Sequence, residues 1–157
     1  NLENAFKITK NKITEFKYIQ SSIINIYFWF DRKIMTDDFI AFTNSDLQWV
    51  FSENIRNNKN QKIVISLSDA EKLLKVNNEK LIKIFENKLR NEMQINKKTK
   101  LIKSKVIRSP KATQNISSIK LNTSKKIHFI GDWTITDLPN TLESAAISGI
   151  NLVKNKF

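Results

Sequence analysis

The stretch that most constrains this chain of 157 residues runs from Ile127 to Gly149 and contains the chain's only two glycines. Its pattern predicts a short apolar strand over Ile127–Ile130, a turn that opens at Gly131, a polar loop, and an amphipathic helix after Pro139. Glycine allows a tight turn or a close backbone approach. A helix that begins after such a loop directs free N–H groups and a partial positive charge toward it. We therefore expect a site here for a phosphate or an electron-rich ring edge.

The start and the buried face of this helix can also be predicted. Asn140 is followed three residues later by Glu143, as in a capping box. Apolar and small residues recur behind it at helical spacing, so one face is expected to pack on a sheet. The residues of this face are Leu142, Ala145, Ala146, Gly149, Leu152 and Val153. Asp132 follows the predicted strand at its carboxyl end, where open α/β sheets place their ligand contacts.

Several residues of the stretch match a known signature. They are Gly131-Asp132-Trp133-Thr134, Leu138-Pro139, Thr141-Leu142-Glu143, Ala145 and Ser148-Gly149. This set resembles the C-terminal FAD-binding signature of the amine oxidase and phytoene desaturase superfamily, and is most similar to its squalene-associated branch, the hydroxysqualene dehydroxylases. The stretch from Ile23 to Arg32, which ends in Phe-Asp-Arg, and the later pair Gln48-Trp49 resemble the substrate domain of that branch. The resemblance covers most of the chain from Ser22 onward.

The resemblance implies FAD as the cofactor. In the family, the Asp of the Gly-Asp pair accepts hydrogen bonds from flavin ribityl or phosphate-linked hydroxyls, and Asp132 occupies that position; without the motif, Asp132 would be interpreted as an Asp that caps a loop. Backbone N–H groups at the helix start lie near the flavin pyrimidine edge in similar proteins. Trp133 is expected either to wall the isoalloxazine or substrate tunnel or to be a plain core residue. The implied cofactor contacts are Gly131, Asp132, Trp133, Thr134, Pro139, Thr141, Leu142, Glu143 and Ala145.

Two departures from the family pattern matter. The chain lacks the GxGxxG fingerprint, which the family places near its N-terminus in a Rossmann βαβ unit that grips the ADP half of FAD. We therefore expect a C-terminal portion of a longer enzyme, with the missing N-terminal FAD-binding half in the same or a separate chain. Asp137 and Ser144 stand where relatives often have glycine. An Asp tolerates a left-handed turn, whereas Ser144 adds a side chain where the helix would approach the ring.

The rest of the chain predicts a sheet with helices. The fold class expected is α/β: an α+β substrate domain with a mixed sheet over residues 1–124, and the strand, loop and helix of a Rossmann-like FAD-binding domain over residues 125–157. Residues 22–30 are apolar on both faces, which predicts a central, buried strand. The other predicted elements are a hairpin of 39–43 and 47–51, an exposed loop over 55–62, a strand over 63–67, a helix capped by Ser68 that runs to Arg90 with a break at Asn77-Asn78, a strand over 103–108 stopped by Pro110, and an irregular segment over 111–126.

The aromatic residues between positions 27 and 51 allow two interpretations. One is an ordinary sheet core, because aromatic side chains dominate core burial. The other is an apolar tunnel for a polyisoprenoid, in which ring faces would also stabilise a developing carbocation. Both can hold, since a strand has two faces. The eight residues are Tyr27, Phe28, Trp29, Phe30, Phe39, Phe42, Trp49 and Phe51, and the tunnel candidates among them are Tyr27, Trp29, Phe42 and Trp49.

Composition excludes several kinds of site. The chain has no cysteine and a single histidine, His128, expected to pack on its strand, so neither a thiolate site nor a histidine metal cluster is expected. No apolar run is long enough to cross a bilayer and no signal-peptide pattern is present. We therefore expect a cytoplasmic protein, with peripheral contact at the inner face of the membrane as the alternative. The net charge of +12 could indicate nucleic acid or anionic lipid, but the lysines are scattered, which favours a solvated surface with a compositional bias.

The function implied by the resemblance is hydride transfer between FAD and a long isoprenoid. In the squalene-associated branch, reduced flavin would deliver hydride to hydroxysqualene as the allylic hydroxyl leaves, giving squalene. In the phytoene desaturase branch, oxidised flavin would remove hydride from a carotenoid precursor. The sequence identifies no catalytic acid or base. Two alternatives stay open: a non-catalytic remnant or split-enzyme subunit, and a basic nucleic-acid-binding module, for which the sequence offers no recognised motif, so that no nucleic acid is expected.

Overall fold

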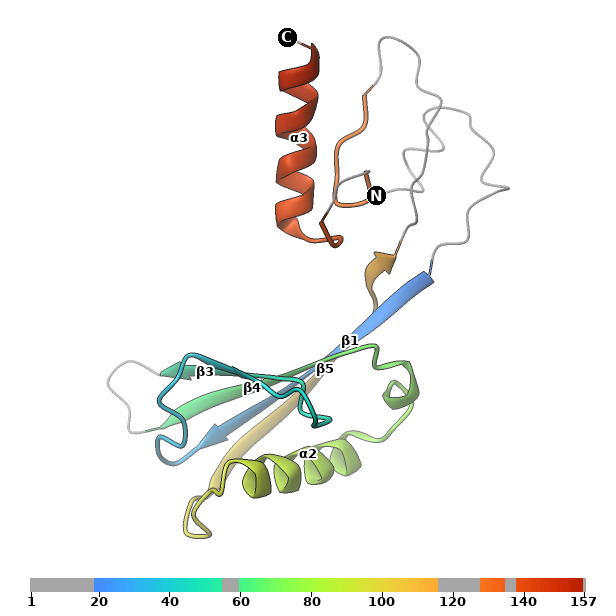
Figure 1. Ribbon diagram of the computed structural model, residues 1–157. Helices are drawn as coiled ribbons and strands as arrows, with labels where there is room; N and C mark the ends of the chain where they lie inside the picture. The colour runs from blue at the N-terminus through green and yellow to red at the C-terminus, as the bar shows by residue number, and fades with distance from the viewer. Residues whose placement is uncertain (1–18, 55–59, 116–127, 135–137, 157) are drawn as a thin grey trace. The chain divides into compact units, whose positions relative to one another are not determined.

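A computed structural model describes residues 19–54, 60–115, 128–134 and 138–156 (Figure 1). Over these ranges the chain combines helices with one antiparallel sheet, so the expected mixture of helices and sheet is confirmed and the expected mixed sheet is wrong. The strands are β1 (Ile19–Phe30), β2 (Phe39–Ala41), β3 (Trp49–Asn54), β4 (Gln61–Ser68) and β5 (Leu101–Asn115), and the helices are the 3₁₀ turn η1 (Glu71–Leu73), α2 (Asn78–Glu92) and α3 (Leu142–Lys156). The chain divides into two compact units, which we describe separately: Ser21–Ala112, here called the sheet unit, and Asn1–Gln20 with Thr113–Phe157, here called the turn–helix unit.

The sheet unit has the strand order β2-β3-β4-β1-β5. β1 lies inside the sheet and pairs antiparallel with β4, from Ile23 opposite Ser68 to Phe30 opposite Gln61. Its β-branched and aromatic residues suit a pleated, half-buried surface. The predicted strand over residues 22–30 and its central position are therefore confirmed. The predicted hairpin is confirmed as β2 and β3, which pair antiparallel.

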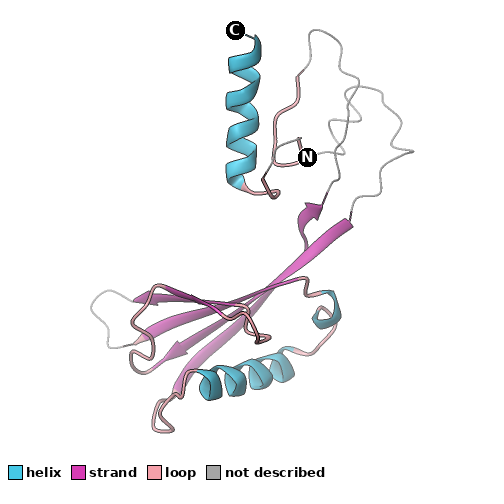
Figure 2. Ribbon diagram, viewed as in Figure 1, coloured by secondary structure: helices cyan, strands magenta, loops and turns pink. Residues whose placement is uncertain are grey.

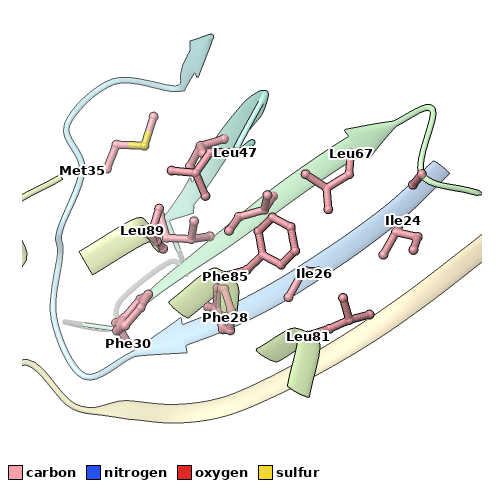
Figure 3. Close-up of a cluster of buried hydrophobic side chains, with 14 residues drawn as sticks. Ile24, Ile26, Phe28, Phe30, Met35, Leu47, Leu67, Leu81, Phe85 and Leu89 are labelled. Carbon is pink, nitrogen blue, oxygen red and sulfur yellow. The ribbon is translucent and has the colours of Figure 1, made fainter. Parts of the chain in front are cut away.

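The core lies between one face of the sheet and α2 (Figures 2 and 3). Successive residues on one face of β1 are fully buried: Ile24, Ile26, Phe28 and Phe30. α2 contributes Leu81, Phe85 and Leu89 to the same core. These residues are spaced four apart and so lie on one side of the helix. Burial of each such side chain contributes about 1.5–3 kcal/mol relative to exposure.

The opposite face of β1 is only half buried. It carries Ile23, Asn25, Tyr27 and Trp29. The helices of the sheet unit contribute to the core on the other face, so no described helix of this unit covers this one. The expectation that β1 is buried on both faces is therefore wrong for this second face, and the sheet presents it as an open surface.

The helix predicted from Ser68 to Arg90 is divided. η1 and α2 are separate, and the predicted break at Asn77-Asn78 is confirmed. The Asn77 side chain accepts a hydrogen bond from the Glu79 N–H at 2.7 Å and so caps α2. The prediction that Ser68 caps a helix is wrong, because Ser68 is the last residue of β4 and its backbone is bound by the Gln48 side chain.

Two strand boundaries also differ from prediction. β4 begins at Gln61, within the predicted loop 55–62, of which residues 55–59 lie outside the described residues. β5 continues through Pro110 to Asn115, although Pro110 was expected to end it. β5 is an edge strand, where the missing proline N–H removes no ladder bond if it faces away from the neighbour. Residues 111–115 of the predicted irregular segment thus belong to β5, and the rest lies outside the described residues.

The turn–helix unit differs from prediction in its strand. His128–Ile130 form no strand, so that prediction is wrong for these residues, and Ile127 lies outside the described residues. A strand needs a hydrogen-bonded neighbour, and no described strand pairs with this segment. His128, expected to pack, is exposed. None of the described helices is both long and apolar enough to cross a bilayer.

The helix predicted after Pro139 is confirmed as α3, but its buried face differs. Thr141 Oγ1 accepts from the Ser144 N–H at 3.4 Å at the start of the helix, and the capping role of Asn140 stays a prediction. Leu142 and Val153, expected to be buried, are 91% and 58% exposed, whereas Ser144 and Ser148 are buried. The expected apolar face is therefore wrong. The buried side is the one whose hydroxyls bind the backbone of the preceding turn.

Candidate functional site

The first candidate site is the turn Gly131–Thr134, here called the Gly131 turn, together with the start of α3. The Gly131 N–H donates to Ser148 Oγ at 2.9 Å, and the same hydroxyl donates to the Ala145 carbonyl at 2.7 Å. The Ser144 hydroxyl lies 3.5 Å from the Asp132 carbonyl oxygen. Two serines one helical turn apart therefore fix the turn against α3 through its backbone.

The Gly131 turn also closes on itself. The Gly131 carbonyl accepts from the Thr134 N–H at 3.1 Å and from the Thr134 hydroxyl at 2.7 Å. A Cβ at position 131 would lie 2.6 Å from Trp133 Nε1, so only glycine leaves room for the indole here. The Trp133 ring also meets the Phe129 ring, with centroids 5.8 Å apart. Trp133 is thus packed within its own segment.

What this arrangement leaves available is a carboxylate and two amides. No described residue hydrogen-bonds the Asp132 carboxylate, which is half buried beside the first turn of α3. Thr141 supplies the acceptors for the N–H groups of Ser144 and Ala145. The N–H groups of Leu142 and Glu143 have no acceptor among the described residues, as is usual for the first turn of a helix. The site therefore offers one acceptor group and two donors on neighbouring backbone.

The structure brings most of the implied cofactor residues together. Gly131, Asp132, Trp133 and Thr134 form the turn, and Thr141, Leu142, Glu143 and Ala145 form the start of α3. Pro139 is exposed and precedes the helix. The residues that sequence reasoning missed as site residues are Ser144 and Ser148. Their i, i+4 spacing is the signal that could have identified them, because it places both hydroxyls on one side of a helix.

The second candidate site is the open face of the sheet, where five aromatic side chains gather; we call this set the open aromatic face. It consists of Tyr27, Trp29, Phe39, Trp49 and Phe51. The strand register explains it: Phe39 lies opposite Phe51, which lies opposite Val64, which lies opposite Tyr27. Trp29 and Trp49 lie two residues from Tyr27 and Phe51 on the same strands and so share the face.

The open aromatic face has an apolar half and a cationic half. Phe39, Trp49 and Phe51 are 57%, 43% and 40% exposed, with ring centroids 6.1–6.3 Å apart. Tyr27 and Trp29 stack with centroids 6.1 Å apart. Lys62 Nζ lies 5.8 Å from the Tyr27 centroid, and Lys103 Nζ lies 5.3 Å from that of Trp29. Lys62 also forms an ion pair with Glu53. One half of the face therefore suits hydrocarbon, and the other, where lysines lie over aromatic rings, suits a polar or charged group.

One tunnel candidate does not belong to this face. Phe42 packs against the core on the other side of the sheet. The residue before it, Ala41, lies opposite Trp49 on the open face, and side chains alternate along an extended chain. Phe42 therefore points to the opposite face, and its assignment to the tunnel is wrong. Phe39 and Phe51 take its place on the open face.

The residues that carried the substrate-domain resemblance have structural roles. The Asp31 carboxylate binds the Arg32 guanidinium at 2.9 and 3.0 Å and accepts from the Lys100 N–H at 3.0 Å. The hydrogen bond from Arg32, with that from Lys100, lowers the pKa of Asp31 from 3.8 to about 2. Asp31 thereby links the end of β1 to the start of β5. The Gln48 amide accepts from the Ser68 N–H at 2.8 Å and donates to its carbonyl at 3.1 Å.

Comparison with known families found no family model that matches the chain, and no curated protein matches it either. The family resemblance stays a prediction, carried by the motif residues themselves.

Proposed function

We propose that this chain is the C-terminal portion of an FAD-dependent oxidoreductase that transfers hydride between flavin and a long isoprenoid, such as hydroxysqualene, squalene or a carotenoid precursor. The observation that carries the proposal is the Gly131 turn, which two buried serines hold against the start of α3, while no described residue hydrogen-bonds the Asp132 carboxylate. The resemblance implies such a carboxylate and the N–H groups of a helix start as flavin contacts. Residues 125–157 would then belong to a Rossmann-like FAD-binding domain.

The donor and acceptor groups fit the cofactor. A carboxylate accepts hydrogen bonds from hydroxyls such as those of the ribityl chain. The N–H groups of Leu142 and Glu143, together with the helix dipole, suit the electron-rich edge of a flavin ring. Ser144 is buried beside the Asp132 carbonyl, so the serine that replaces a family glycine is engaged within the turn. When bound, FAD would supply the hydride chemistry, and these residues would hold and orient it.

The open aromatic face supports an apolar substrate. Phe39, Trp49 and Phe51 are large, exposed and in mutual contact, and burying them against a hydrocarbon chain is favourable by about 25 cal/mol per Å² of apolar area. Tyr27 and Trp29 extend this surface across the sheet. Their part is to bind the chain and exclude water, while their ring faces can stabilise positive charge as it develops.

Exposed apolar side chains of the turn–helix unit support a protein partner. Ile130, Leu142, Ile150 and Val153 are each more than half exposed. A missing N-terminal FAD-binding half, in the same or a separate chain, would cover such residues and complete the cofactor site. The proposal places the protein in the cytoplasm and includes peripheral contact with anionic lipid at the inner face of the membrane, which would rest on the basic charge together with the apolar substrate. The alternative, a non-catalytic remnant or a split-enzyme subunit, has the same fold as the proposed enzyme portion. It differs only in whether this chain acts by itself or completes a flavin site with a separate chain.

The test is the visible absorption spectrum of the chain purified together with any polypeptide encoded directly upstream. We expect a flavin band that is lost in Asp132→Ala and retained in Asp37→Ala, which removes an exposed carboxylate in the sheet unit. A folded, colourless preparation would contradict the cofactor assignment. A band that survives Asp132→Ala would show that flavin binds elsewhere.

A second candidate is binding of single-stranded nucleic acid, favoured by Lys62 and Lys103 over aromatic rings on an uncovered sheet. Proteins that bind single strands combine stacking aromatics with cationic side chains. This function predicts binding of a labelled oligonucleotide that weakens steeply between about 50 and 200 mM salt. Binding of an uncharged isoprenoid would instead be nearly insensitive to salt.

A further inference from the structure

A pocket outside both candidate sites lies in the sheet unit between α2, the end of β4 and the turn before β3; we call it the α2 pocket. Its volume is about 310 Å³, which is at the small end of the range for small-molecule sites. Its floor is apolar. Leu67, Ala70 and Phe85 are buried, and Leu73 and Ile84 pack against the same core. Figure 3 labels Leu67, on β4, and Phe85, on α2, among the buried side chains of the core.

The rim of the α2 pocket is charged. Lys72 and Lys88 lie on it, with Asp46 and Asp69. Lys88 and Asp46 form an exposed ion pair, and such pairs contribute little in water, so another anion can compete for Lys88. Lys72 has no carboxylate within ion-pair distance among the described residues. The rim thus holds two lysines and two aspartates: Lys88 is shared with Asp46, and Lys72 has no ion-pair partner among the described residues.

The mouth of the α2 pocket is held in an unusual conformation. Gln48 and Asp69 both line it and have positive φ angles of 52° and 54°. Such left-handed non-glycine residues are uncommon and persist where the surroundings impose them, often at ligand sites. Here the imposing contact is visible, since the Gln48 amide binds both backbone groups of Ser68. The two segments that frame the mouth are therefore joined before any ligand arrives.

We propose that the α2 pocket binds a small monocarboxylate with an apolar body. The hydrocarbon lies on the floor formed by Leu67, Leu73 and Phe85, and the carboxylate lies between Lys72 and Lys88. A neutral molecule leaves Lys72 without a counter-ion, and a cation meets both lysines. Asp69, on the same rim, can accept from an additional hydroxyl or N–H on the ligand. This inference does not depend on the proposed flavin chemistry.

The test uses the full chain and three probes that share one hydrocarbon chain: octanoate, octanol and octylammonium. Backbone amide chemical shifts report both the affinity and the location of binding. We expect octanoate to saturate and to shift the amides of Gln48, Asp69 and Lys72. Octanol and octylammonium should bind at least about tenfold more weakly, the difference that one charge-assisted contact supplies.

Variants locate the charge and the cavity. Lys72→Gln should weaken octanoate binding about tenfold. Lys80→Gln removes the same charge from an exposed position of α2 outside the pocket and should leave binding unchanged. Ile84→Trp should obstruct the cavity from the helix side. The proposal is overturned if octanol or octylammonium binds as tightly as octanoate, if Lys80→Gln weakens binding as much as Lys72→Gln, or if the shifts fall on Trp49 and Phe51 of the open aromatic face.

Discussion

Gln61 provides the sharpest quantitative test of how this sheet is held together. It is fully buried at the start of β4, an unusual location for an amide side chain. Its Oε1 accepts from the N–H groups of Ile34 and Met35 at 2.8 and 3.0 Å, and its Nε2 donates to the Met35 carbonyl at 2.7 Å. Gln61 thereby fixes the segment that leads from β1 to β2, and β2 carries Phe39 of the open aromatic face.

We expect Gln61→Met to destabilise the protein by about 3 kcal/mol. Methionine has a similar shape but makes none of these hydrogen bonds. The N–H and the carbonyl of Met35, a residue only 3% exposed, would lose their partner. Each buried group left unsatisfied costs about 1–3 kcal/mol. Ile34 is half buried, so water can partly satisfy its N–H, and the apolar methionine recovers some free energy because its burial requires no desolvation of an amide.

The assay is urea unfolding followed by tryptophan fluorescence, with Gln48→Met as the matched control. Gln48 also uses its amide for two backbone hydrogen bonds, but at the exposed Ser68, where water replaces them. We expect the control to lose no more than about 1 kcal/mol. Equal losses in the two variants would refute the argument that burial of the unsatisfied groups sets the magnitude.

Three further predictions concern the Gly131 turn and the loss of folding stability at low pH. Ser148→Ala should accelerate hydrogen exchange of the Gly131 amide about tenfold, because the variant removes the hydroxyl that accepts from this amide. An unchanged exchange rate would show that Ser148 does not hold the Gly131 turn. Gly131→Ala should displace the Trp133 indole and reduce its near-ultraviolet circular dichroism, because the added Cβ would lie 2.6 Å from Nε1; an unaltered spectrum would contradict the packing. The pKa of Asp31 is lowered from 3.8 to about 2 in the folded state, so its stabilising contribution is present above pH 4 and is lost as the pH falls toward 2. Asp31→Asn should therefore have a lower urea midpoint than the unsubstituted protein at pH 6 and the same midpoint at pH 2, and a constant difference across this range would refute the linkage.

Sequence reasoning succeeded where local chemistry is sufficient. The strand over residues 22–30 follows from its β-branched and aromatic run, and the hairpin follows from a polar turn between two apolar segments. The division of the long helix at Asn77 follows from the preference of asparagine for helix caps. For the two candidate sites, Gly131, the helix after Pro139 and the strands that carry the aromatic residues could likewise be predicted from local sequence.

Other features depended on which neighbours each segment meets. His128–Ile130 has the composition of a strand but belongs to none of the described strands, and Pro110 lies inside a strand because β5 is at the edge. Gln61 is buried because its amide makes hydrogen bonds to the backbone of Ile34 and Met35, in a loop that is distant in sequence. The periodicity of α3 indicated an apolar buried face, whereas the side that is buried carries Ser144 and Ser148, whose hydroxyls reach the Gly131 turn.

The sequence by itself determined β1, the hairpin of β2 and β3, the cap of α2 and the helix α3, because hydrophobic periodicity, capping and turn preferences act within a few residues. Only the tertiary structure decided which face of each element is covered. It assigned Phe28 and Phe30 to the core beneath α2 and left Tyr27 and Trp29 on the open face, although all four are aromatic residues of one strand. The physical reason is that a side chain is buried only where another element packs against it. Strand order and register decide which element that is.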